Sequence, residues 1–189
     1  LERFSQTLDW ALKMVLLIAI PAALALIILA NPILMTLFQY GKTSAADITM
    51  STYSLQAYSL GLVAFMLIKV LAPGFYARQD MKTPVRIGII AMVSNMVLNL
   101  VFVLPLYLIW NIGHVGLALA TSASAFLNMG LLWHGLVKKG VYRPASPWLK
   151  TLVQLGLANL AMAAVLLALL PQLNGWADWF WLERVTALA

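Results

Sequence analysis

The sequence contains no cysteine among its 189 residues, which excludes disulfide bonds, zinc–thiolate centres and thiol nucleophiles. Charge is almost as scarce, because only 10% of the residues are Asp, Glu, Lys or Arg, against about 25% in soluble domains. Hydrophobic residues make up 63% of the chain, and the mean hydropathy is +0.92. Such a composition has too little polar surface for a soluble fold, so it indicates an integral membrane protein.

Motifs of enzymatic chemistry are also missing. The sequence has no G-x-S-x-G, H-E-x-x-H, P-loop or dinucleotide fingerprint. Its six carboxylates fall near expected helix ends or loops, and neither histidine has a carboxylate at metal-ligand spacing. We therefore expect no enzyme, no cofactor and no metal centre. The net charge of +6 is better explained by loop cations that set topology and meet membrane lipids than by nucleic acid.

Five stretches are long and apolar enough to span a membrane, which takes about 20 residues. A sixth begins near Trp176 and stops with the sequence, so we expect the chain to be a piece of a longer protein. The predicted fold is all-α, a polytopic transmembrane helix bundle with five complete spans and a truncated sixth. The five spans cover about 10–30, 47–72, 84–107, 114–137 and 147–170.

Local signals predict where these helices begin and end. Asn31-Pro32 is expected to end the first span, and Pro73-Gly74 to break the second where it reaches the membrane surface. Ser44 or Thr43 resembles a helix N-cap, with Asp47 in the first turn of the second span.

Loop charges predict the orientation. The loops over 76–86 and 138–150 are rich in cations and lie on the same side as the N-terminus, if the helices alternate. The opposite side has Lys42 and Arg184, and an aromatic cluster over 176–181 that suits a membrane interface. Because cations concentrate on the cytoplasmic side, we expect the N-terminus and both basic loops to be cytoplasmic. The basic loops contain Arg78, Lys82, Arg86, Lys138, Lys139, Arg143 and Lys150.

The second span carries an unusual number of polar residues at helical spacing. They either form a helix–helix interface or line a water-filled cavity. Lys69, near the cytoplasmic end, either extends its ammonium to the interface or meets a phosphate in that cavity. The polar face comprises Thr49, Thr52, Tyr53, Gln56 and Ser59.

The third span places Asn95 and Asn99 one helical turn apart on one face. A buried amide needs partners, since leaving one unpaired costs on the order of a few kcal/mol. The candidates on the fourth span are Thr121, Ser122, Ser124 and Asn128. The residues form either an interhelical hydrogen-bond network or a cation site from Asn95, Asn99 and Thr121, which lacks a carboxylate.

The run "VLAPGFYARQDMKTPVRIGI" (70–89) resembles the cytoplasmic-loop signature of the MurJ/MviN lipid II flippase family. The stretches "LERFSQTLDWAL", "LFQYGKTSAAD" and "GHVGLALATSASAFLN" are similar to the family as well, so the resemblance covers essentially the whole chain. It implies membership of the multidrug/oligosaccharidyl-lipid/polysaccharide exporter superfamily, with fourteen transmembrane helices in two six-helix lobes and two extra helices. Such proteins move the undecaprenyl-pyrophosphate-linked peptidoglycan precursor from the inner to the outer leaflet of the bacterial cytoplasmic (inner) membrane by alternating access.

On this resemblance, residues 1–140 correspond to family helices 9–12 of the second lobe, and 141–189 to helix 13 and the start of helix 14. The expected partners are lipid II, membrane lipids, a coupling cation and the missing N-terminal helices. Tyr53, Gln56 and Ser59 would form part of the cavity wall. The cations Arg78, Lys82 and Arg86 would either attract the pyrophosphate or only set the topology, and Asp80 is expected to pair locally with one of them.

Two other functions remain open at this stage. One is a cation-coupled exporter of amphiphilic compounds on the same scaffold. The other is a non-transporting membrane scaffold for cell-wall enzymes.

Overall fold

The computed structural model describes residues 2–38, 43–110, 112–142 and 148–169. In these ranges the chain forms five helices and no strand: α1 (Glu2–Phe38), α2 (Ala45–Tyr76), α3 (Lys82–Trp110), α4 (Gly113–Lys138) and α5 (Trp148–Leu169). All five are long and apolar enough to cross a membrane, which confirms the predicted fold class. The predicted sixth segment and its aromatic cluster lie outside the described residues, as do Lys42, Arg143 and Arg184.

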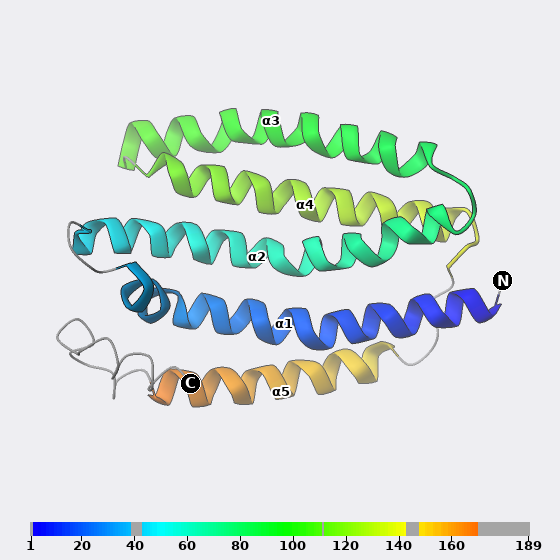
Figure 1. Ribbon diagram of the computed structural model, residues 1–189, viewed down its shortest axis with the longest axis horizontal. Coiled ribbons are helices and arrows are strands. Elements are labelled where there is room, and N and C mark those ends of the chain that lie inside the picture. Colours follow the sequence, from blue (N-terminus) through cyan, green and yellow to red (C-terminus); the bar gives the residue numbers. More distant parts are fainter. Residues whose placement is uncertain (1, 39–42, 111, 143–147, 170–189) are drawn as a thin grey trace.

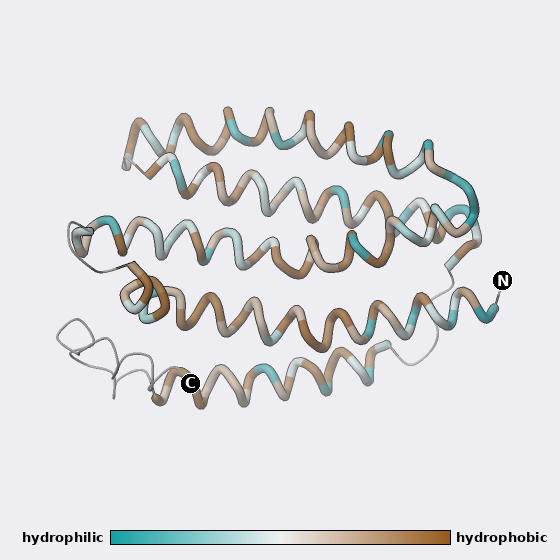
Figure 2. Tube along the Cα trace, viewed as in Figure 1, coloured by the Kyte–Doolittle hydropathy of each residue, from teal (hydrophilic) through white to brown (hydrophobic). Residues whose placement is uncertain are grey.

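The helices lie side by side in the order α3, α4, α2, α1, α5 (Figure 1). The main contacts join α3 to α4, α4 to α2 and α2 to α1, and α5 packs on α1. The N-terminus, the α2–α3 turn and the end of α4 gather at one end of this layer (Figure 1). Apolar residues dominate the middle of the helices, and polar residues are denser in the turn at that end (Figure 2).

The start of α2 is a capping box, as the sequence predicts. The Ser44 side chain accepts a hydrogen bond from the backbone N–H of Asp47 at 3.2 Å. The Asp47 carboxylate in turn accepts the backbone N–H of Ser44 at 3.0 Å. Of the two candidates, Ser44 is therefore the N-cap.

Two predicted helix ends are wrong, and both lie at prolines. Helix α1 continues through Pro32 to Phe38, although its last turns leave the axis of the preceding helix (Figure 1). The Pro32 carbonyl accepts the Thr36 hydroxyl at 2.7 Å. Helix α2 continues through Pro73-Gly74 to Tyr76. Proline kinks a membrane helix without ending it where local adjustments satisfy the freed backbone groups.

A continuous apolar core joins the four helices α1, α2, α3 and α4 near the end that holds the α2–α3 turn. It also includes the two residues Val141 and Tyr142 that follow α4. This core therefore holds four helices together just beneath the turn. Its buried members are Leu8, Leu12, Leu67, Leu71, Phe75, Ile87, Leu132, Leu136, Val141 and Tyr142.

Helices α2 and α4 approach closely where a glycine faces a serine. A methyl group added at Gly61 would lie 2.9 Å from Cα of Ser122, so only glycine fits this crossing without a shift. The Ser122 hydroxyl donates a hydrogen bond to the Ala57 carbonyl at 2.6 Å. Small residues and one interhelical hydrogen bond thus fix α2 against α4.

Candidate functional site

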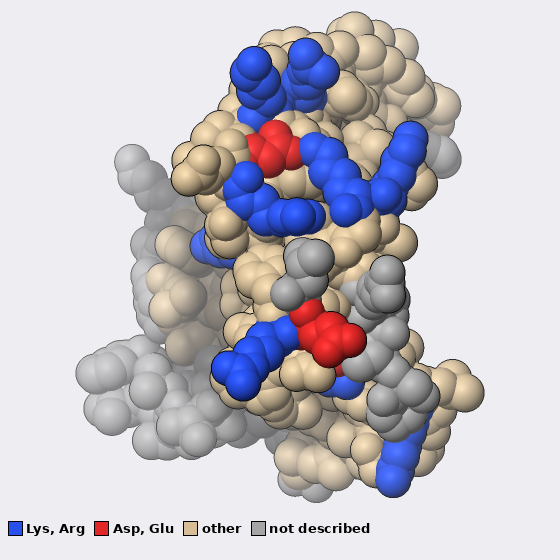
Figure 3. Space-filling model, turned by 90° about the vertical axis from the view of Figure 1, so that its right-hand side faces the viewer, with Lys and Arg blue, Asp and Glu red and all other residues tan. Residues whose placement is uncertain are grey.

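Basic side chains gather at the end of the bundle that holds the N-terminus, the α2–α3 turn and the end of α4 (Figures 1 and 3). We call it the cationic end. Every lysine and arginine in the described ranges lies in the part of its helix or turn that is nearer to this end. These residues are Arg3, Lys13, Lys69, Arg78, Lys82, Arg86, Lys138, Lys139 and Lys150.

The α2–α3 turn is tight and is capped by its own carboxylate. Gln79 adopts a left-handed backbone conformation with φ of 59°, and the N–H of Asp80 returns to the Phe75 carbonyl at 3.2 Å. One Asp80 oxygen accepts the backbone N–H of Thr83 at 3.1 Å, and the other accepts its hydroxyl at 2.7 Å. Asp80 therefore caps the first turn of α3.

The ion-pair partner of Asp80 is Lys139, which follows α4 directly. The Lys139 ammonium also donates to the Thr83 hydroxyl at 2.8 Å. The Lys139 ammonium, followed by the Thr83 hydroxyl, holds the pKa of Asp80 well below its usual range. The expected local pairing of Asp80 is therefore wrong.

Sequence reasoning missed a buried carboxylate inside α1. Asp9 is only 4% exposed and forms an ion pair with Lys13 at 2.8 Å. It also accepts hydrogen bonds from the Tyr142 hydroxyl at 2.7 Å and from the Trp148 indole N–H at 2.6 Å. Burial, followed by the nearby carboxylate, raises the pKa of Tyr142. The four-residue spacing of Asp9 and Lys13 hints at a pair, but nothing in the sequence locates Tyr142 or Trp148 beside them.

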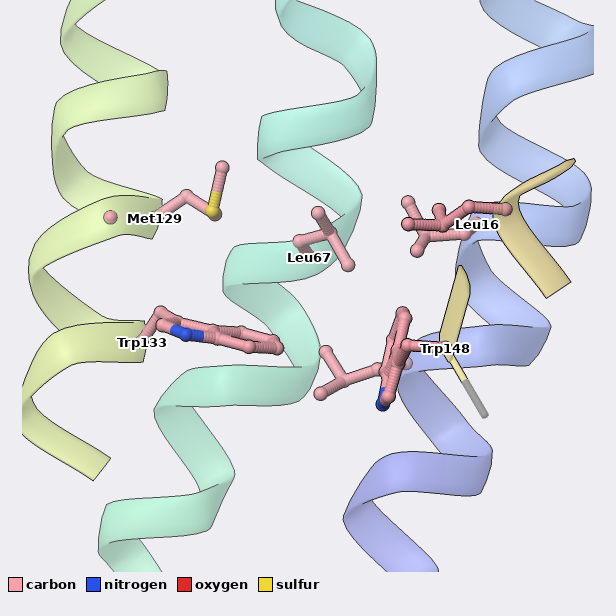
Figure 4. Close-up of a pocket in the computed structure, with 8 residues that line it drawn as sticks. Leu16, Leu67, Met129, Trp133 and Trp148 are labelled. Atoms are coloured by element: carbon pink, nitrogen blue, oxygen red, sulfur yellow. The ribbon is translucent and has the colours of Figure 1, made fainter. Parts of the chain in front are cut away.

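An apolar pocket of about 540 Å³ lies next to this junction, among α1, α2, α4 and α5. Trp133 and Trp148 stand at one end of it, with Leu16, Leu67 and Met129 beyond them (Figure 4). The two indole rings meet edge to face, with centroids 6.2 Å apart. Such a lining suits hydrocarbon and offers nothing for a charged headgroup.

Only some of the polar residues of α2 line one common depression. Tyr53 and Gln56 line a depression of about 380 Å³, and the Gln56 amide donates to the Ile27 carbonyl of α1 at 3.0 Å. Ser59 is buried and donates to the Leu55 carbonyl of its own helix at 2.7 Å. Lys69 is exposed and lies sixteen residues beyond Tyr53, or roughly 160° around an ideal helix. These four residues therefore do not form one wall.

Asn95 and Asn99 form a chain of hydrogen bonds that reaches α4. The Asn99 amide donates to the Asn95 side-chain oxygen at 3.1 Å, and Asn95 donates to the Ser124 hydroxyl at 3.1 Å. Thr121 instead donates to the Leu117 carbonyl of its own helix at 2.8 Å. The side-chain oxygen of Asn99 is buried, and no residue in the described ranges donates to it. The arrangement is an interhelical network with one spare acceptor.

Comparison with known proteins agrees with this architecture. The family model described as "Lipid II flippase MurJ" matches residues 2–186. A Vibrio cholerae protein, "Probable lipid II flippase MurJ", is 49% identical over 99% of this chain and 34% of its own length. A Burkholderia cenocepacia protein, "Lipid II flippase MurJ", is 47% identical over 87% of this chain and 31% of its own length.

A solved structure also matches. It is named "Lipid II flippase MurJ, inward closed conformation", with a TM-score of 0.75 and 25% identity over 98% of this chain and 37% of that one. The chain thus spans about a third of the length of these relatives. It is a multi-pass membrane protein, and it belongs to the MurJ lipid II flippase family.

Proposed function

We propose that this chain is the C-terminal part of a lipid II flippase, which moves the lipid-linked peptidoglycan precursor from the inner to the outer leaflet and so supports cell-wall synthesis. The single observation that carries the proposal is the family match, which runs through nearly the whole chain. It rests on similarity to proteins about three times as long, so the activity belongs to the complete transporter.

The chain divides into two functional parts in this proposal. Residues 1–140 complete the second transporter lobe, and residues 141–189 supply the extra C-terminal helices. The packing of the helices supports this division, because α1, α2, α3 and α4 share one core, whereas α5 packs mainly on α1. Val141 and Tyr142 extend that core two residues past the boundary. The preceding helices of the same protein are then the main partner of this bundle.

In this proposal the chain lies in the bacterial cytoplasmic (inner) membrane, with its cationic end toward the cytoplasm. The N-terminus and the loops 76–86 and 138–150 are then cytoplasmic. The gathering of lysine and arginine at this end supports the orientation, since cytoplasmic loops are enriched in both.

The substrate pathway combines two kinds of side chain. Tyr53 and Gln56 supply the polar wall, and the buried Ser59 lies one turn further along α2. Lys69 offers a cation on another side of the same helix, further toward the cytoplasm. Moving a pyrophosphate across roughly 30 Å of hydrocarbon is costly unless a polar cavity replaces water, and alternating access provides such a cavity while the lipid tail stays in the bilayer. The cations Arg78, Lys82 and Arg86 attract the pyrophosphate at the entrance.

A coupling cation binds beside Asn95, Asn99 and Thr121 in the same proposal. The spare oxygen of Asn99 supports it, because amide oxygens are ligands for hard cations. In the described ranges the hydrogen bonds of these three residues involve no carboxylate, so a further ligand has to come from other helices.

The test measures lipid II flipping by the complete transporter in liposomes. We expect Gln56→Leu and Lys69→Met to slow flipping at normal expression. The matched controls are Gln154→Leu and Lys150→Met on α5, which remove an exposed amide and an exposed ammonium away from the proposed wall.

Normal flipping by both variants removes Gln56 and Lys69 from the pathway. Failure of the purified wild-type transporter to flip lipid II refutes the proposed function and favours a scaffold. Transport of amphiphilic compounds that lipid II does not inhibit favours a cation-coupled exporter instead.

A further inference from the structure

At the cationic end, one contact decides which cations of the α2–α3 turn stay unpaired. In the described ranges, the α2–α3 turn and its flanks contain a single carboxylate, that of Asp80. Three cations of the turn, Arg78, Lys82 and Arg86, lie within six residues of it along the chain. Short separation along the chain favours pairing of Asp80 with one of them, yet its partner comes from α4.

The contacts of Asp80 explain why these cations stay free. One carboxylate oxygen is occupied by the Thr83 backbone N–H, and the other by the Thr83 hydroxyl and the Lys139 ammonium. In the part of the chain that the structure describes, Arg78, Lys82 and Arg86 are exposed and form no ion pair.

The Lys139 ammonium is held in place from three sides. It contacts Asp80, donates to Thr83 at 2.8 Å and lies 5.6 Å from the centre of the Phe75 ring, in cation–π range. Phe75 is only 1% exposed and belongs to the core, so the ring is a fixed platform. The adjacent Lys138 is also exposed, but in the described ranges it has no carboxylate partner.

We propose that Lys139 is a positioning residue, which sequesters Asp80 so that Arg78, Lys82 and Arg86 remain available to a phosphate polyanion at the α2–α3 turn. This inference rests on the proposed function, and it adds the residue that keeps the entrance cations unpaired. The ligand class is a pyrophosphate group, because clustered Arg and Lys favour multivalent phosphate. Without Lys139, the Asp80 carboxylate pairs with Arg78, Lys82 or Arg86, because these cations are close to it along the chain.

The charge arithmetic separates Lys139 from its neighbour. Lys138→Gln removes one cation from the surface. Lys139→Gln removes one cation and also releases a carboxylate, which then competes with the anion for another cation. Lys139→Gln is therefore expected to reduce the binding free energy of the anion about twice as much as Lys138→Gln. Because affinity depends exponentially on free energy, the factor by which Lys139→Gln weakens binding is about the square of the factor for Lys138→Gln.

The test places a fluorophore on Met81→Cys in the complete transporter, in a background without other cysteines. Met81 lies in the turn and is 59% exposed, so a fluorophore there can be attached without disturbing the core and senses binding at this turn. Inorganic pyrophosphate is titrated without magnesium, and sulfate at matched ionic strength is the reference. Because contacts between exposed charges are weak, we expect Lys138→Gln to weaken binding about threefold and Lys139→Gln about tenfold.

Two further variants protect the test from simple misfolding. Lys139→Arg keeps the ion pair and is expected to bind pyrophosphate within about twofold of the wild type. The double variant Asp80→Asn/Lys139→Gln has no carboxylate to release, so it is expected to bind about threefold more weakly than the wild type, as Lys138→Gln does, and not about tenfold. Both results support sequestration of Asp80, because a merely structural role predicts no recovery in the double variant.

Equal effects of Lys138→Gln and Lys139→Gln overturn the proposal. A wild-type turn that does not respond to pyrophosphate overturns it as well. Lipid II flipping is measured in parallel, so that the two hypotheses fail separately. Flipping without pyrophosphate binding at the turn refutes the role of Lys139 only, whereas pyrophosphate binding without flipping refutes only the proposed function.

Discussion

The crossing of α2 and α4 at Gly61 leads to a quantitative prediction. Gly61→Ala would place a methyl group 2.6 Å from the Ser122 hydroxyl oxygen and 2.9 Å from Ser122 Cα. The hydroxyl can rotate away, but the Cα belongs to the backbone of α4, so the two helices have to separate locally. That movement also stretches the 2.6 Å hydrogen bond from Ser122 to the Ala57 carbonyl.

The expected cost follows from two opposing effects. Overpacking a well-packed contact costs about 1–3 kcal/mol. Replacing glycine by alanine inside a helix gains about 0.5–1 kcal/mol where space is free. Gly61→Ala is therefore expected to lower the free energy of unfolding by on the order of 1–2 kcal/mol, before any weakening of the hydrogen bond. Gly88→Ala in α3 is the matched control, because nothing lies within 4 Å of its added methyl group.

The measurement is thermal unfolding of the complete transporter in one detergent at one protein concentration. We expect the unfolding temperature to fall for Gly61→Ala and to stay level or rise for Gly88→Ala. A Gly61→Ala protein as stable as the Gly88→Ala protein would refute the close α2–α4 crossing.

Three more predictions concern the polar contacts. Trp148→Phe removes the indole donor to Asp9 while keeping an aromatic ring, and the lost hydrogen bond to a charged group is worth about 1.5–3 kcal/mol. Hydrogen exchange at the start of α5 should accelerate, and unchanged exchange would show that Asp9 does not hold α5. Asn95→Leu removes the link to Ser124 and should lower stability by about 0.6–1.7 kcal/mol, as seen in unfolding, whereas a rise in stability would contradict the link. Because its pKa is lowered in the folded state, the Asp80 ion pair should contribute fully above the usual carboxylate pKa of about 4 and fade only as the pH falls through the folded value. Intrinsic-rate-corrected exchange of the turn should thus be flat from pH 7 to about pH 4, and loss of protection near pH 6 would contradict it.

The five spans were predictable because long apolar runs have few alternatives to a membrane helix. Their ends were less predictable at prolines. Residue patterns treat Pro32 and Pro73 as helix breakers, yet both lie inside helices. In a membrane, the cost of leaving a helix is the exposure of backbone groups to hydrocarbon, so a kinked helix is preferred to an ended one.

The candidate site was predictable only where partners lie close in sequence. The four-residue spacing of Asn95 and Asn99 correctly predicted a shared face and a partner on α4. Asp80 and Lys139 are 59 residues apart, and Asp9 and Trp148 are 139 apart. Contacts over such separations depend on how the helices pack, which spacing along one helix does not encode.

The hydroxyl groups that bond within their own helices bear on how the protein is made. Ser59 and Thr121 each donate to the carbonyl four residues earlier, so their polar groups are satisfied as soon as the helix forms. Such hydroxyl groups need no partner helix when their own helix leaves the translocon for the bilayer. Gln56 needs a carbonyl of α1, which has already been synthesised, whereas Asn95 needs Ser124 on a helix still to come. Helix α3 therefore carries an incompletely satisfied amide into the membrane until α4 arrives, which makes the α3–α4 pair the natural unit of insertion.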